Sequence, residues 1–234
     1  MIPLHDTLPA RHPPRAVWGL IGANALVFAL ELSLSPDDLA GLFATFAAVP
    51  ARIAGPGDAP PIWTLVTCMF LHGGWLHLLG NLWMLWIFGD NVEDRMGPGR
   101  FVAFYLLCGL LASTTEVAAN PAASESILGA SGAIAGVMGA YLAMFPRARI
   151  VMLVPLLFWP LYIAVSAFGF LVYWFVLQVI SGSLDAGTGG VAYAAHAGGF
   201  IAGLLLHRAF LRHEYRAHVP GEDGLEATWL RRHA

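Results

Sequence analysis

The sequence has no lysine and little charge of either sign. Only 12% of its 234 residues are charged, whereas 58% are hydrophobic, and the mean hydropathy is +0.67. Soluble domains carry about 25% charged residues. This composition therefore excludes a disordered chain, a nucleic-acid-binding protein and an ordinary cytosolic enzyme, and it favours a polytopic membrane protein.

Cysteine is also scarce. The two thiols, Cys68 and Cys108, lie in apolar segments and show neither a disulfide pattern nor a zinc-ligand spacing. We interpret them as small buried hydrophobic side chains. The sequence predicts no cofactor and no metal site.

Six segments are apolar enough to cross a membrane, given that a spanning helix needs about 20 mostly apolar residues. In chain order they are 16–34, 74–88, 101–119, 130–145, 161–180 and 191–211. The fourth is short and rich in glycine, so we expect the other helices to shield it from lipid. Pro155 and Pro160 disfavour a continuous helix early in the apolar stretch 150–180, which places the fifth span after them.

The placement of arginine supports this count and predicts the topology. Eleven of the twelve arginines fall on one side of a six-helix arrangement, and only Arg52 falls on the other. By the positive-inside rule both termini are cytoplasmic. The predicted fold is an all-α, multi-pass membrane protein with a cytoplasmic segment 1–15, a membrane domain 16–212 and a cytoplasmic tail 213–234. The bias towards alanine, glycine and arginine indicates a GC-rich bacterial genome, and so an inner (plasma) membrane.

Four polar side chains lie inside the predicted spans, where polar groups are costly. His77 and Asn81 are four residues apart and share one helix face, Ser131 opens the fourth span, and His196 lies early in the sixth. The second, fourth and sixth spans cross the membrane in the same direction. All four side chains therefore lie at a similar depth in the outer half of the membrane, which indicates a functional site.

These residue types suit nucleophilic catalysis. A serine hydroxyl needs a base to take its proton, and histidine is the base suited to neutral pH. Ser131 at a helix N-terminus lies beside unpaired backbone N–H groups that can stabilise an oxyanion, with Asn81 and His77 as further donors. No carboxylate is obviously placed to orient His196, so the sequence favours a Ser–His dyad over a triad.

Small residues recur at a spacing of four on the helices that carry the two predicted catalytic residues. They are Gly132 and Gly136 on the fourth span and Gly199 and Gly203 on the sixth. Such faces let two helix backbones approach closely. We expect this approach to bring the serine within hydrogen-bond reach of the histidine.

Other interpretations of these residues stay open. Small residues are common in membrane helices for packing alone, and a lone histidine there is more often structural or part of a proton relay. His72, His77 and His196 could also bind a metal, although no tight ligand spacing such as H-x₃-H is present. A small transporter would need paired intramembrane carboxylates or repeated halves, and the sequence has neither.

Together, the motifs resemble those of the rhomboid intramembrane serine proteases over about residues 60–205. Residues 77–81 are similar to the family's H-x-x-x-N motif, and Glu93 and Arg95 to its E-x-R motif. Gly129, Ser131 and Gly132 match G-x-S-G, and residues 195–203 match A-H-x-x-G-x-x-x-G. All four motifs occur in the family's order and on the expected helices.

The resemblance implies a six-helix rhomboid-like bundle, with Ser131 as nucleophile and His196 as general base. Asn81, His77 and the backbone N–H of Ser131 would form the oxyanion hole. The implied function is a serine endopeptidase that cleaves transmembrane segments of membrane-protein substrates within the bilayer, through an acyl-enzyme. The sequence specifies neither the substrate nor the oligomeric state.

An inactive rhomboid-like protein that binds membrane proteins for quality control is the alternative. Such relatives typically lack the serine or the histidine, and both are present here. Two positions depart from the family pattern. Thr64 follows Trp63 where an arginine is usual, and Ala135 stands where some members place an aromatic ring on the histidine, so we expect another side chain to pack there.

Overall fold

The computed structural model describes residues 1–56, 62–156, 159–184 and 191–216. Within these ranges, a helix lies in each of the six predicted segments. These helices are α1 (Arg15–Ser33), α5 (Trp75–Met96), α6 (Pro98–Ala119), α7 (Ser131–Met144), α8 (Ala167–Leu184) and α9 (Tyr193–Phe210). Three of them, α1, α6 and α8, are long and apolar enough to cross a membrane. The chain thus has candidate membrane helices, while the count of six spans stays a prediction.

Short helices occupy the long connection between α1 and α5. They are α2 (Pro36–Phe46), α3 (Pro50–Ala54), α4 (Thr64–Thr67) and the 3₁₀ helix η1 (Cys68–Phe70), and a further short helix, α10 (His213–Arg216), follows α9. Ser35 caps α2, because its hydroxyl accepts a hydrogen bond from the backbone N–H of Asp38. α2 has no buried residue.

The turn between α5 and α6 depends on one glycine. Gly97 has φ of +80°, a left-handed conformation that side chains rarely adopt. It ends α5, and Pro98 at the first position of α6 fixes a helical φ for the next helix. The guanidinium of Arg212 lies against Gly97, so this turn also meets the end of α9.

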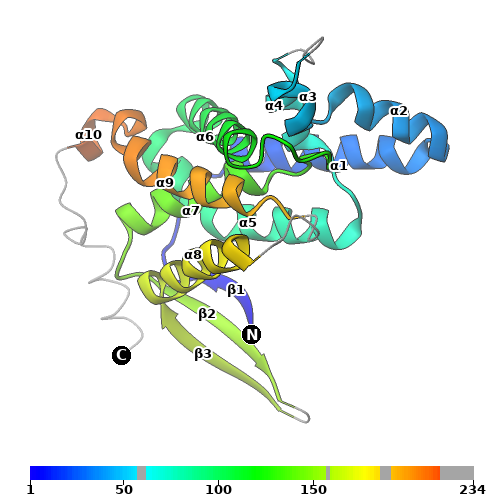
Figure 1. The fold of residues 1–234 in the computed structure, drawn as a ribbon. Helices are drawn as coiled ribbons and strands as arrows, with labels where there is room; N and C mark the ends of the chain where they lie inside the picture. Colours follow the sequence, from blue (N-terminus) through cyan, green and yellow to red (C-terminus); the bar gives the residue numbers. More distant parts are fainter. Residues whose placement is uncertain (57–61, 157–158, 185–190, 217–234) are drawn as a thin grey trace.

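The fold is mostly helical, as predicted, but it is not all-α. A three-stranded antiparallel sheet is formed by β1 (Ile2–Asp6), β2 (Arg149–Pro155) and β3 (Pro160–Ser166), in that order. β3 covers the start of the segment predicted as the fifth span, and α8 begins only at Ala167. The hairpin of β2 and β3 extends away from the helices near α8 (Figure 1).

A short apolar run does not by itself distinguish a strand from a buried helix. In 149–166, isoleucine and valine favour strands, and Pro155 pairs with Pro160 at the far end of the hairpin. β1, at the start of the chain, completes the sheet by pairing with β2, so that Ile2 lies opposite Leu153. This pairing is non-local, so periodicity within either segment could not reveal it.

α7 lies at the centre of the bundle, packed against α5, α6 and α9 (Figure 1). Every residue from Gly132 to Leu142 is buried, so the expectation that neighbouring helices shield this short segment is confirmed. The backbones of α7 and α9 touch at their glycines. A Cβ atom at Gly199 would overlap the carbonyl oxygen of Gly132, and one at Gly203 would overlap that of Gly136.

The polar motif at the end of α5 fastens neighbouring helix ends. The carboxylate of Glu93 accepts hydrogen bonds from the backbone N–H groups of Ala16 (3.0 Å) and Val17 (2.9 Å), in the first turn of α1. A negative charge there also suits the helix dipole. The guanidinium of Arg95 stacks on Phe145 and Tyr215, with its carbon 5.1 and 4.5 Å from the two ring centres.

β1 is fastened to this same end of the bundle through Asp6. Its carboxylate accepts hydrogen bonds from the hydroxyl of Tyr141 on α7 and from the side-chain amide of Asn91 on α5. Burial raises the pKa of Asp6 to about 7, and the nearby carboxylate of Asp90 contributes to the rise. The hydrogen bonds from Tyr141 and from the backbone N–H of Leu8 only partly oppose it.

We predict that Gly203→Ala destabilises the protein. The added methyl group would meet the Gly136 carbonyl on a backbone that cannot move aside, and such overpacking costs about 1–3 kcal/mol in the free energy of unfolding. The thermal unfolding midpoint in detergent measures this loss. Gly22→Ala is the control, because nothing lies within 4 Å of the added atom and a helical Gly→Ala change is otherwise neutral or stabilising. Equal midpoints for the two variants would contradict the close contact.

We predict that Asp6 makes stability fall as the pH rises from 4 to 7. Its pKa is about 7 in the folded state against an ordinary 3.8, so the folded protein keeps a proton that the unfolded chain releases. This contribution is complete below pH 4 and is lost as the pH rises through 7. The thermal midpoint should decrease by at least about 5 °C over this interval, and the decrease should shrink in Asp6→Asn. An unchanged slope in that variant would show that another group titrates.

Candidate active site

The structure brings Ser131 and His196 into contact. Ser131 is the first residue of α7, and His196 lies in the first turn of α9. The serine Oγ and the histidine Nε2 are 2.7 Å apart, so the hydroxyl can donate its proton to the ring. The contact follows from the glycine faces below it, because only bare backbones allow α7 and α9 to approach this closely.

His77 and Asn81 lie against the loop that leads into α7. Gly129 has φ of +101°, and a Cβ atom built there would overlap Nε2 of His77 and lie 3.2 Å from Nδ2 of Asn81. Both side chains of α5 therefore face the backbone just before Ser131. The loop is held from the other side by the backbone N–H of Gly129, which donates to the carbonyl of Cys68 (2.9 Å).

A histidine outside the predicted site orients Asn81. The Asn81 amide Nδ2 donates to Nε2 of His72 (3.0 Å), while Nδ1 of His72 is 3.3 Å from the carbonyl oxygen of Phe70. Burial, with a smaller contribution from His77, lowers the pKa of His72 to about 4. A neutral ring can accept the amide hydrogen, and the second N–H of the amide remains available.

His72, His77 and His196 are the side chains that could also have bound a metal. Among the residues that the structure describes, no three His, Cys, Asp or Glu side chains gather as a metal site would require. His72 instead donates its backbone N–H to the carboxylate of Glu31 (3.0 Å), and its ring lies edge-on to His77, 5.1 Å between ring centres.

Sequence reasoning missed the residue that contacts the other nitrogen of the histidine. Oε1 of Gln178, on α8, lies 2.7 Å from Nδ1 of His196. A carboxylate has this role in a catalytic triad, whereas Gln178 carries a neutral amide. The signal that was available is a single amide side chain in an otherwise largely apolar helix.

An aromatic residue from α8 lies next to the histidine ring. The centre of the Trp174 ring lies 5.9 Å from that of His196, with the planes tilted by 37°. Tyr193 meets the same imidazole edge-on at 6.5 Å. Trp174 and Gln178 are four residues apart and share one face of α8, so the expected replacement for the missing aromatic comes from a different helix.

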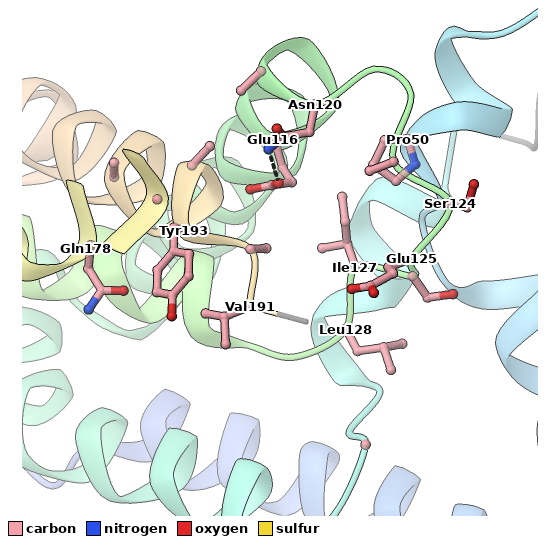
Figure 2. A pocket seen from close by; sticks show the side chains of 18 of the residues that line it. Pro50, Glu116, Asn120, Ser124, Glu125, Ile127, Leu128, Gln178, Val191 and Tyr193 are labelled. Carbon is pink, nitrogen blue, oxygen red and sulfur yellow. Dashed lines mark hydrogen bonds between the residues drawn. The ribbon is translucent and has the colours of Figure 1, made fainter. Parts of the chain in front are cut away.

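A cavity of about 520 Å³ opens beside the pair. Its walls come from α6, α8, the start of α9 and the loop that precedes α7, and they include His77 and Gln178. Figure 2 shows Gln178 and Tyr193 on one side of this space and Glu125 and Leu128 on the other. The cavity is large enough to admit water and a short extended peptide segment.

Glu116, at the wall of this cavity, fixes the start of α9. One carboxylate oxygen accepts the backbone N–H of Ala195 (2.9 Å), and the other accepts the side-chain amide of Asn120 (2.6 Å). Ala195 directly precedes His196. A carboxylate at this helix N-terminus satisfies an otherwise unpaired donor, a role that the sequence did not reveal.

The fold and the site together define a helical membrane protein with a hydrogen-bonded serine–histidine pair. Residues 59–213 match the rhomboid domain family, and the chain belongs to that family.

Two of the relatives align with three quarters or more of the chain. RHOMBOID-like protein 5 of Arabidopsis thaliana is 32% identical over 183 residues, which cover 75% of this chain and 54% of the plant protein. Rhomboid protein 1, mitochondrial, of Saccharomyces cerevisiae is 30% identical over 215 residues, 83% of this chain and 53% of the yeast protein. The chain thus spans about half the length of these two relatives. Rhomboid protease GluP of Bacillus subtilis is 42% identical over 80 residues, 34% of this chain and 15% of its own.

The comparisons contradict the predicted bacterial inner membrane. Of the two relatives described above, one is a plant protein and the other is a mitochondrial protein. The prediction rested on residue composition, which reflects the base content of a genome. Arginine placement distinguishes the two sides of a membrane, but it does not identify which membrane is spanned.

We predict that Glu116→Ala lowers the free energy of unfolding by about 1–3 kcal/mol, because a buried backbone donor and the Asn120 amide lose their charged acceptor. The thermal unfolding midpoint in detergent measures the loss. Glu125→Ala removes the same charge from an exposed position on the cavity wall and should change stability by less than about 0.5 kcal/mol. Similar losses for both variants would mean that net charge, and not the cap on α9, is responsible.

Proposed function

We propose that this chain is an intramembrane serine endopeptidase that cleaves transmembrane segments of membrane-protein substrates. One observation carries the proposal: Oγ of Ser131 lies 2.7 Å from Nε2 of His196, and their neighbours His77 and Gln178 line a cavity. The match to the rhomboid domain family supports it, and so does the similarity to Rhomboid protease GluP. The mitochondrial relative supports an organellar membrane as the location.

In the proposed reaction, His196 takes the hydroxyl proton as Oγ of Ser131 attacks the scissile carbonyl carbon. The carbonyl oxygen gains negative charge in the tetrahedral intermediate. When this intermediate collapses, the carbon–nitrogen bond breaks and His196 gives the proton to the leaving amine. Water from the cavity then attacks the acyl-enzyme, with His196 again as base, and releases the second product and the free serine.

The negative oxygen needs donors that are already in place. The backbone N–H of Ser131 is one, because the first turn of a helix has unpaired N–H groups. Asn81 is the second, since His72 occupies one hydrogen of its amide and holds Nδ2 beside the loop at Gly129. His77 is the third, with Nε2 next to the same loop.

A substrate segment must unwind before it can react at this site. In a helix, the scissile carbonyl is already hydrogen-bonded and shielded by side chains, and lipid offers the freed backbone groups no partner. The cavity contains polar groups from Gln178, Asn120 and Glu125 that can pair with an unwound backbone. Helix-destabilising residues in the substrate should therefore favour cleavage.

We predict that Ser131→Ala and His196→Ala each lower cleavage of a single-span model substrate in liposomes by at least about 10³-fold, because removing either member of such a pair disables the attack. Ser33→Ala and His207→Ala replace the same residue types where each bonds a carbonyl of its own helix, and both should cleave at the wild-type rate.

Cleavage by Ser131→Ala at the wild-type rate would overturn the nucleophile. A fluorophosphonate probe supplies the second measurement, because it should label the wild type and fail to label Ser131→Ala. A wild-type protein that neither cleaves nor reacts with the probe would instead favour the inactive membrane-protein-binding alternative.

A further inference from the structure

We propose that Gln178 is a positioning residue for His196, which holds the imidazole in the tautomer that leaves Nε2 free to accept the serine proton. This inference rests on the proposed protease function and adds a third member to the predicted dyad. The new member is a neutral amide on α8, and it contacts the ring nitrogen that faces away from Ser131.

The position of the single proton on the imidazole decides whether His196 can act as a base. A neutral histidine has one N–H, and only its unprotonated nitrogen can act as base. The two ring nitrogens of His196 are each 2.7 Å from a partner oxygen, Oε1 of Gln178 at Nδ1 and Oγ of Ser131 at Nε2. The carbonyl oxygen of an amide has no proton to donate, so Nδ1 must carry the hydrogen in this arrangement. Nε2 then presents its lone pair to the serine hydroxyl.

Without an acceptor at Nδ1, the tautomer with the proton on Nε2 competes. Ser131 could then accept a hydrogen bond from Nε2–H, and that tautomer cannot take the serine proton. In serine proteases with a triad, a carboxylate prevents this and also stabilises the imidazolium, and loss of its acceptor function leaves the wrong tautomer. Two carboxylates lie on the cavity wall: Glu116 is bonded to Ala195 and Asn120, and Glu125 is exposed.

A neutral amide suits this location. A carboxylate removed from water carries a large desolvation cost, whereas an amide costs far less to bury when it is hydrogen-bonded. Trp174, one helical turn from Gln178, packs near the same ring at 5.9 Å between ring centres. The ring is therefore held at one edge by a hydrogen bond and at its side by an aromatic residue, both from α8.

Kinetics of three variants on the single-span model substrate in liposomes test the proposal. Gln178→Leu has a similar size but no acceptor, and we expect kcat to fall by about 10–100-fold while KM changes by less than about twofold. Gln178→Glu keeps an acceptor oxygen and should recover at least about tenfold of the loss in kcat. Leu177→Ala changes the adjacent, exposed residue of α8 and should leave both constants unchanged.

A spectroscopic measurement separates positioning from a merely structural role. With ¹⁵N-labelled histidine in detergent, the His196 signals, identified by their absence in His196→Ala, should show the proton on Nδ1 in the wild type and in Gln178→Glu. In Gln178→Leu, the proton should be shared with Nε2. The thermal unfolding midpoint of Gln178→Leu should stay close to that of the wild type.

The outcomes distinguish this proposal from the proposed function. If Ser131→Ala and His196→Ala are inactive but Gln178→Leu keeps the wild-type kcat, the protease assignment stands and the role of Gln178 is overturned. An unchanged His196 tautomer in Gln178→Leu would also overturn it, as would a loss of kcat that Gln178→Glu does not recover. If the wild type does not cleave and the fluorophosphonate probe does not label it, the proposed function itself fails, whereas the tautomer measurement still reports on the hydrogen bond.

Discussion

The contact between the backbones of α7 and α9 holds the centre of the bundle and the two site residues together. Gly132 and Gly136 on one helix meet Gly199 and Gly203 on the other so closely that a methyl group at either of the last two would overlap a carbonyl oxygen. In a membrane, where burial of apolar surface does not drive helices together, such close packing is a main source of association. It sets the distance between the helix ends that carry Ser131 and His196, and therefore whether those side chains can share a proton.

Around this contact, polar side chains are supported by further polar side chains. Glu31 accepts from the backbone of His72, whose ring accepts from Asn81. Glu116 accepts from the start of α9, and the Gln178 amide meets His196. Buried polar groups without partners are expensive, and His72, Asn81 and His196 each have a polar partner here. The supports come from α1, α6 and α8, which explains why a small site needs most of the bundle.

The three-stranded sheet could not be predicted from the local pattern of apolar residues. The apolar stretch 150–180 predicts a membrane helix, and its second part does form α8. Its first part instead forms β2 and β3, and β2 pairs with the first residues of the chain. Strand pairing between residues about 150 positions apart leaves no periodic mark in either segment. The composition that suggested a bacterial membrane failed for a different reason, because it carries no information about compartment.

Sequence patterns located the long helices, apart from the start of α8, and identified the serine and histidine that pair and the glycines that let their helices approach. These features follow from local hydropathy and from residue spacing along single helices. The surroundings of the pair depend on tertiary packing: Gln178 at Nδ1, Trp174 beside the ring, Glu116 at the start of α9 and His72 behind Asn81. Each of these residues acts across a helix–helix contact, and the rotation of one helix against another is fixed by packing of the whole bundle.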